Sequence, residues 1–141
     1  MKRKIFSIAV SAFVLALIIS SCTSPNKVLV KKDGNWTAIT TTKTTAGGVS
    51  VTTVDTSTMN FKDDGTGTIA SGGLTLNFNW TWDKKDKKIE FTITIAGVPY
   101  IKDYTVTEKK AKSEKWSYSK TETTSGVTTV TDEQVSLTRM D

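Results

Sequence analysis

The stretch Leu74-Thr75-Leu76-Asn77-Phe78-Asn79-Trp80-Thr81-Trp82 decides the fold of this chain. Every even-numbered residue in it is large and apolar, and every odd-numbered residue is polar. A period of two places all five apolar side chains on one face of a β-strand. Residues 89–95 repeat the pattern on odd positions, and the charged residues 83–88 between them have the length of a hairpin connection. The two segments are therefore predicted to pair as antiparallel strands.

Six further segments are predicted as strands, because β-branched and aromatic residues fill them and glycine-containing turn signals separate them. They span residues 36–44, 49–61, 66–70, 100–108, 114–123 and 127–139. About eight short antiparallel strands with tight connections favour an all-β up-and-down barrel or a closely related sandwich. A barrel leaves no free strand edge, and the cysteine pair of an immunoglobulin-like sandwich is absent. The fold class predicted is an eight-stranded antiparallel barrel preceded by a cleaved signal helix.

The N-terminus has the pattern of an export signal. A basic start, Lys2-Arg3-Lys4, precedes an apolar run from residue 5 to residue 19, which is shorter than the roughly 20 residues of a membrane-spanning helix. The run ends in Ile19-Ser20-Ser21-Cys22, which resembles the lipobox of bacterial lipoproteins. This resemblance implies cleavage before Cys22 and acylation of Cys22 with palmitate-like chains. The alternative is an unpaired thiol in an uncleaved helix.

The lipobox resemblance defines the expected domain organisation and location. Residues 1–21 are predicted to be a lipoprotein signal peptide, residues 22–32 the lipidated N-terminus and tether, and residues 33–141 the barrel. No aspartate directly follows Cys22, and no acidic run occurs near it. This pattern resembles that of outer-membrane lipoproteins in the cell envelope that face the periplasm, with cell-surface exposure as the alternative. The membrane is thus an expected partner, through the lipid anchor.

The net charge of +5 comes mostly from the signal. Three of the 19 basic residues and none of the 14 acidic residues precede Cys22, so the mature chain carries 16 − 14 = +2. Nucleic-acid binding requires a strongly basic face. Nucleic acid is therefore not expected as a partner.

The mature chain offers few groups for catalysis. It has no histidine, and its single cysteine is the predicted acylation site. This excludes Ser-His-Asp and Cys-His catalysis and the usual zinc sites. Several carboxylates fall in predicted turns, among them Asp63, Asp64 and Asp83, where they suit turn geometry. No enzyme activity, catalytic residue, metal or cofactor is expected.

A second resemblance involves both ends of the predicted barrel. Gly34-Asn35-Trp36 is similar to the Gly-x-Trp that opens the lipocalin barrel, and Arg139 ends the last predicted strand, where lipocalins often have an arginine. The chain lacks the disulfide cysteines and the Thr-Asp-Tyr signature of secreted lipocalins. The resemblance implies a lipocalin-like barrel in which Trp36 closes one end and Arg139 packs across its indole, a cation-aromatic contact. Gly34, Trp36 and Arg139 are thus predicted as a fold motif.

The apolar face predicted for the barrel interior supports more than one function. As a ligand site it would bind a small hydrophobic or amphipathic molecule. As a filled core it would leave a structural or interaction lipoprotein that contacts envelope proteins through its surface, with the protein partner unknown. A third alternative is carbohydrate contact through Tyr100 and Tyr104, expected to be exposed. A monomer is expected. The candidate interior residues are Leu76, Phe78, Trp80, Trp82, Phe91, Ile93, Trp116 and Tyr118.

Overall fold

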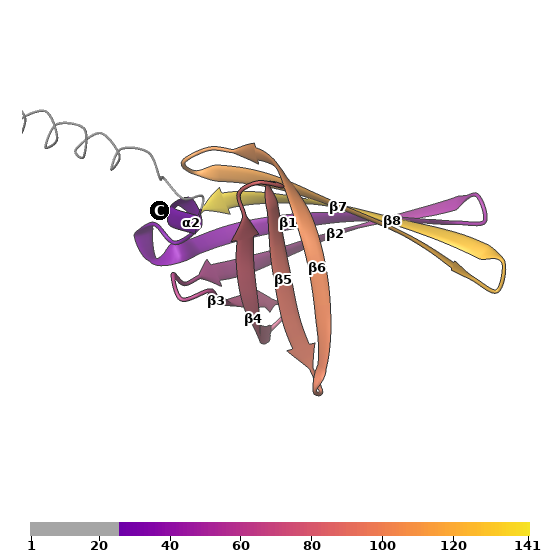
Figure 1. Cartoon of the computed structure of the whole chain (residues 1–141), viewed down its shortest axis with the longest axis horizontal. Coiled ribbons are helices and arrows are strands. Elements are labelled where there is room, and N and C mark those ends of the chain that lie inside the picture. The colour runs from indigo at the N-terminus through magenta and orange to yellow at the C-terminus, as the bar shows by residue number, and fades with distance from the viewer. Residues whose placement is uncertain (1–25) are drawn as a thin grey trace, which may run out of the picture.

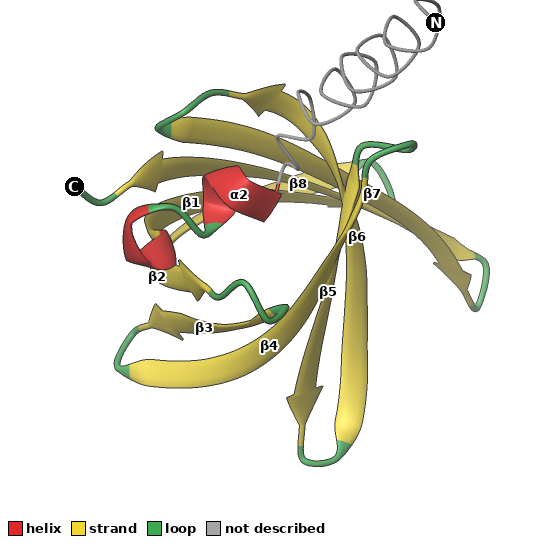
Figure 2. Cartoon of the chain, turned by 60° about the vertical axis from the view of Figure 1, so that its left-hand side comes forward, coloured by secondary structure: helices red, strands yellow, loops and turns green. Residues whose placement is uncertain are grey.

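The structure, a computed structural model, describes residues 26–141 (Figures 1 and 2). Eight antiparallel strands form a closed barrel in which each strand pairs with its neighbours in sequence and the first pairs with the last. The predicted signal peptide and Cys22 lie outside the described residues. No helix within residues 26–141 combines the length and apolarity needed to cross a bilayer.

All eight predicted segments are strands, and their bounds differ from the prediction by at most two residues at either end. The all-β barrel prediction is confirmed, and an eight-stranded up-and-down barrel is compatible with a lipocalin-like fold. The strand pairings and the buried residues of the described part, 26–141, form a barrel with a hydrophobic core. The strands are β1 (Asn35–Ala46), β2 (Val49–Phe61), β3 (Thr66–Ser71), β4 (Leu74–Asp83), β5 (Lys88–Ile95), β6 (Val98–Lys109), β7 (Ser113–Thr124) and β8 (Val127–Arg139).

Four connections, all at one end of the barrel, are only two residues long. Gly47 and Gly48, between β1 and β2, have φ values of 55° and 82°. Positive φ at both central residues defines the type I′ turn, whose twist matches that of paired strands. The same sign pattern occurs at Gly72-Gly73, Ala96-Gly97 and Ser125-Gly126. Because these loops are so short, they leave this end of the barrel, the mouth, uncovered.

The wall of the barrel splits in two places towards the mouth. β6 pairs with β7 only through residues 105–109 and 114–117, and β2 pairs with β3 only through residues 58–61 and 67–70. Figure 1 shows the consequence: the hairpins β1–β2 and β7–β8 extend together to one side, while β4, β5 and β6 run in another direction. The mouth is therefore bounded by two diverging walls, one of β7-β8-β1-β2 and one of β3-β4-β5-β6.

Aromatic rings fill the opposite, closed end. Phe61 makes edge-to-face contacts with Phe78, Trp80, Phe91 and Trp116, with centroid distances of 5.3–6.0 Å. Such contacts stabilise beyond simple area burial. The closed half of the interior is thus packed solid. The buried core comprises Leu29, Trp36, Ala38, Met59, Phe61, Phe78, Trp80, Ile89, Phe91, Trp116, Val135 and Leu137.

A buried carboxylate lies beside this core. Glu114 is 3% exposed, and its Oε2 accepts a 2.9 Å hydrogen bond from Trp116 Nε1. Burial raises the pKa of Glu114, because the charged form loses its hydration, while the indole donor partly opposes the shift. The charge therefore destabilises the fold most at pH values above the raised pKa, whereas protonation relieves that cost.

Two short helices cover the closed end (Figure 2). They are α2 (Asn26–Leu29) and the 3₁₀ helix η1 (Lys32–Gly34). Leu29 is 2% exposed, and the Trp36 indole Nε1 donates a 2.8 Å hydrogen bond to its carbonyl. The Arg139 guanidinium donates to the Val28 carbonyl. The described part of the predicted tether, residues 26–32, is thus not a free linker, because apolar Leu29 gains more from packing on the barrel than from exposure.

The predicted fold motif lies at this closed end. Trp36 and Arg139 are directly opposite each other in the β1–β8 register, and the Arg139 Cζ is 4.8 Å from the Trp36 ring centroid. The expected cation-aromatic contact is therefore present. Gly34 has a φ of 65° and approaches β2 so closely that a Cβ atom would lie 2.0 Å from the Phe61 carbonyl oxygen. Only glycine fits this approach.

Candidate functional site

The barrel mouth contains a pocket of about 290 Å³ above the aromatic core. Its floor is formed by core side chains, and its sides by both diverging walls. The apolar lining residues come from six strands and include Met59, Ile69, Phe78, Phe91, Ile93 and Trp116. The polar lining residues include Thr40, Asp55, Ser57, Ser71, Lys102 and Glu133. A largely apolar cavity with a few polar groups is the usual composition of a small-molecule site.

Large apolar side chains continue along the rim of one wall. Leu74 is 61% exposed, Ile95 47%, Val98 52% and Tyr100 57%. Ile93 pairs with Tyr100 and Ile95 pairs with Val98, so these side chains share the inward face of the β5–β6 hairpin. Their exposure follows from the divergence of the walls, which removes the opposite strands that would cover them. The mouth therefore presents an apolar wall to solvent.

A hydrogen-bonded cluster lies inside the pocket. The Glu133 side chain is 8% exposed, and its Oε1 accepts a hydrogen bond from Lys102 Nζ at 2.5 Å. Its Oε2 accepts a 2.8 Å hydrogen bond from the Tyr104 hydroxyl. Lys102 Nζ also lies 5.4 Å from the Tyr118 ring centroid. Both carboxylate oxygens thus have partners, as a buried charge requires.

The Tyr104 hydroxyl remains a hydrogen-bond donor across the physiological pH range. Burial raises the pKa of Tyr104 far above its usual value, and the adjacent Glu133 carboxylate raises it further. Both causes act on the phenolate, which would be desolvated and repelled by the carboxylate. The Lys102 side chain is 43% exposed, and its ammonium group has N–H donors that the cluster does not use.

Four of the eight predicted interior residues line this pocket. They are Phe78 on β4, Phe91 and Ile93 on β5, and Trp116 on β7. Phe78 and Ile93 are paired across β4 and β5, so the period-two pattern of these strands brings them together as the sequence predicts. The alternation identified these residues because it fixes which face each side chain occupies.

The other four do not line it. Trp80 is in the closed-end core, where its Nε1 donates a 3.1 Å hydrogen bond to the Thr66 carbonyl. Trp82 lies further towards the closed end, half-buried, with Lys109 Nζ 6.0 Å from its ring. Leu76 is half-buried outside the pocket lining, and Tyr118 lines a neighbouring groove. Strand alternation gives the face of a residue but not its depth along the barrel axis, so it does not separate pocket-lining residues from core residues.

Sequence reasoning missed the charged cluster. Glu133 occupies an inward position of β8, on the same face as Val135 and Leu137, and this alternation was the available signal. Tyr104 was expected to be an exposed aromatic residue, which is wrong: its hydroxyl is bonded to Glu133 inside the barrel, whereas Tyr100 is exposed. Within residues 26–141 no group of three or more His, Cys, Asp or Glu side chains is arranged to hold a metal.

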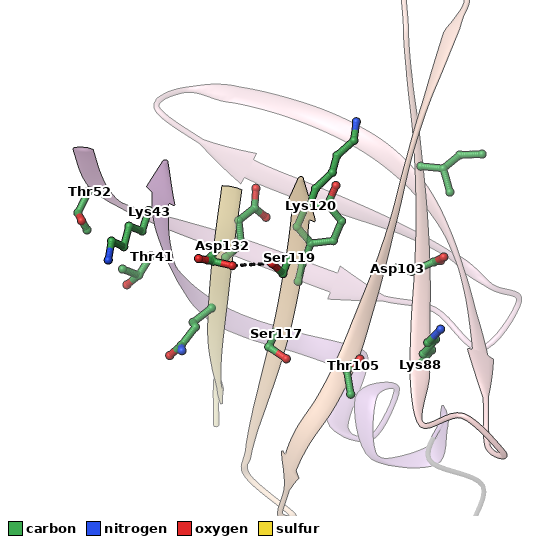
Figure 3. A pocket seen from close by; sticks show the side chains of 14 residues that line it. Thr41, Lys43, Thr52, Lys88, Asp103, Thr105, Ser117, Ser119, Lys120 and Asp132 are labelled. Atoms are coloured by element: carbon green, nitrogen blue, oxygen red, sulfur yellow. Dashed lines mark hydrogen bonds between the residues drawn. The ribbon is translucent and has the colours of Figure 1, made fainter. Parts of the chain in front are cut away.

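A second, more open groove of about 970 Å³ lies where β6 separates from β7 (Figure 3). We call it the β6/β7 groove. Figure 3 shows Lys88, Asp103 and Thr105 on one side of the separation and Ser117, Ser119 and Asp132 on the other. Ser119 Oγ and Asp132 Oδ1 are 2.6 Å apart and hydrogen-bonded. Glu133 lines both this groove and the mouth pocket, so the two spaces adjoin at the charged cluster.

Comparisons of the chain with models of protein families, with curated proteins and with solved structures find no match.

Proposed function

We propose that this protein is a lipid-anchored lipoprotein of the outer membrane, facing the periplasm, whose lipocalin-like barrel binds a small hydrophobic or amphipathic molecule. The observation that carries the binding role is the uncovered apolar pocket with one satisfied charged cluster in it. A volume of about 290 Å³ corresponds to about ten water-sized groups at roughly 30 Å³ each, which suits one short alkyl chain or a small ring system.

Enclosure would supply the affinity. Removing apolar surface from water gains about 25 cal/mol per Å², and aromatic side chains such as Phe91 and Trp116 provide a rigid floor for it. The polar lining residues, Lys102 among them, would then orient the polar part of the ligand. Because type I′ turns leave the mouth uncovered, no loop has to open before the ligand enters.

The lipid anchor would hold the mouth away from its own bilayer. Asn26 follows Cys22 by four residues, which span at most about 14 Å when fully extended. α2 lies at the closed end, opposite the mouth (Figure 1). An acylated Cys22 would therefore keep the closed end near the membrane surface, and the mouth would receive its ligand from the aqueous side.

Acylation of Cys22 is tested by metabolic labelling. Cells that express the full chain with an alkyne-tagged palmitate analogue are expected to label the protein and to retain it in the membrane fraction, because two or more acyl chains anchor stably. Cys22→Ser should lose the label, whereas Ser24→Ala should keep the label and remain in the membrane fraction. Labelling of the Cys22→Ser chain at the wild-type level would contradict the lipobox interpretation.

Ligand binding is tested by filling the pocket. The mature chain, residues 22–141 with Cys22→Ser, is titrated with N-phenyl-1-naphthylamine, a neutral dye whose fluorescence rises in apolar surroundings. Ile93→Trp places a large ring in the pocket and is expected to weaken dye binding by about tenfold or more. Ile39→Trp makes the same change at a residue that is 46% exposed and does not line the pocket, and it should bind as wild type.

The filled-core alternative is supported by the solid aromatic packing of the closed half. Under that alternative the dye would bind no better to the wild type than to Ile93→Trp. A panel of lipids and metabolites would also leave the melting temperature unchanged. Crosslinking in cells would then be expected to capture one stoichiometric envelope partner through the outer surface.

A further inference from the structure

We infer that the β6/β7 groove is a headgroup subsite, so that the barrel binds a single-chain amphiphile with an uncharged, hydroxyl-rich headgroup, of which an alkyl glycoside is the simplest example. This inference rests on the proposed ligand-binding function and specifies its ligand. The alkyl chain occupies the mouth pocket, and the headgroup passes the Lys102–Glu133 pair into the groove.

The first supporting observation is the continuity of the two spaces. β6 and β7 stop pairing beyond Thr105 and Ser117, and from there the barrel wall is open. Glu133 lines the apolar pocket on one side of this opening and the polar groove on the other. A ligand with an apolar and a polar part therefore finds a matching space on each side of one charged pair.

The second observation is the charge of the groove. Its lining contains three lysines, Lys43, Lys88 and Lys120, and three acids, Asp103, Asp132 and Glu133. Lys120 is further paired with Glu122, with Nζ and Oε1 2.6 Å apart. A net positive lining would favour carboxylate or phosphate headgroups and a net negative one would favour amines. The balanced lining favours neither.

The third observation is the hydrogen-bonding capacity of the groove. Thr41, Thr52, Thr105, Ser117 and Ser119 bring five hydroxyl groups into a lining that also holds carboxylates and ammonium groups. A hydroxyl both donates and accepts, as sugar hydroxyls do. The lining of the mouth pocket, by contrast, is mostly apolar. The pocket therefore suits the alkyl chain of a neutral amphiphile, and the groove suits its headgroup.

The Lys102–Glu133 pair also opposes a fatty acid. A carboxylate bound beside Lys102 would lie close to the buried Glu133 charge, and Asp55 also lines the pocket. Like charges at short distance repel. Lys102 retains donors for an ether or hydroxyl oxygen, which carries no charge, so a neutral headgroup can pass where a carboxylate is disfavoured.

The test compares three probes that share a ten-carbon chain: decyl maltoside and decanoate below their micellar concentrations, and decanol below its solubility limit. Calorimetric titration of the mature chain with Cys22→Ser is expected to give decyl maltoside an affinity about tenfold higher than decanol, since two net hydrogen bonds are worth roughly that factor. Decanoate should bind more weakly than decanol.

Two variants separate the groove from the pocket. Ser117→Ile fills the groove with a residue that suits strands, and it should remove most of the maltoside advantage while decanol binding stays unchanged. Ser136→Ile makes the same change at an exposed residue of β8 outside the groove and should behave as wild type, with unfolding curves to confirm that both variants fold. Equal affinities for decanol and decyl maltoside, or a higher affinity for decanoate than for decanol, would overturn the inference but not the ligand-binding function. Binding of none of the three probes would overturn both.

Discussion

Replacement of Trp36 by alanine is expected to lower the free energy of unfolding by about 3–5 kcal/mol, the range for truncating a fully buried tryptophan. Trp36 is 0% exposed and joins three parts of the chain at the closed end. Its ring packs under the Arg139 guanidinium from β8, and its Nε1 is bonded to the Leu29 carbonyl of α2. The truncation leaves a cavity, an unpaired carbonyl and an uncovered guanidinium.

Urea unfolding of the mature chain with Cys22→Ser measures this loss, with Trp82→Ala as the matched control. Trp82 is only half-buried, and its Nε1 has no hydrogen-bond partner within residues 26–141, so its truncation should cost less than half as much. Trp36→Phe keeps an aromatic ring for Arg139 but loses the hydrogen bond to Leu29. Its free energy of unfolding should therefore lie between those of the wild type and of Trp36→Ala. Equal losses for Trp36→Ala and Trp82→Ala would show that the closed end does not depend on this contact.

Gly34→Ala is expected to destabilise the barrel by about 2–5 kcal/mol, because strain and overpacking act together. The φ of Gly34 is 65°, a conformation that costs an L-residue roughly 1–2 kcal/mol. The added Cβ would also lie 2.0 Å from the Phe61 carbonyl oxygen. That atom belongs to the backbone of a paired strand, so the overlap can be relieved only by moving β2 or η1.

Gly126→Ala is the control that isolates the overlap. Gly126 has a φ of 79°, but an added Cβ would meet no atom within 4 Å. The free energy of unfolding of Gly126→Ala should fall by only about 1 kcal/mol, since the conformational strain is partly offset by the lower entropy of the unfolded chain. Thermal unfolding of the two variants would report the difference. Similar melting temperatures for Gly34→Ala and Gly126→Ala would show that the close approach to β2 is not required.

The closed end of the barrel contains most of the buried core, and the mouth contains most of the exposed apolar side chains of the site. The closed half holds the aromatic core, the Trp36–Arg139 contact and the two short helices, and thus supplies most of the burial. The mouth, with tight turns and diverging walls, leaves apolar side chains such as Leu74 and Tyr100 exposed. Exposed apolar surface at a concave site is typical of a binding region rather than of structural packing.

Sequence alone predicted most of the fold. Alternation in Leu74–Trp82 and in residues 89–95 identified the strands and the inward faces, since a strand cannot turn one side chain without turning its neighbours. Glycine-containing pairs such as Gly47-Gly48 marked the hairpins, because positive φ is accessible there. The Trp36–Arg139 contact could be expected only through the resemblance to lipocalins, because it joins residues more than 100 positions apart.

What the sequence by itself determined is local: the strands, their faces and the turns, together with the absence of histidine from the chain. The tertiary structure decided where the barrel is closed and where it opens. The pairing of β6 with β7 ends at Thr105 and Ser117, and this single register places the Lys102–Tyr104–Glu133 cluster between an apolar pocket and a polar groove. Strand twist and register accumulate over all eight strands, so no local pattern encodes where two neighbouring strands part.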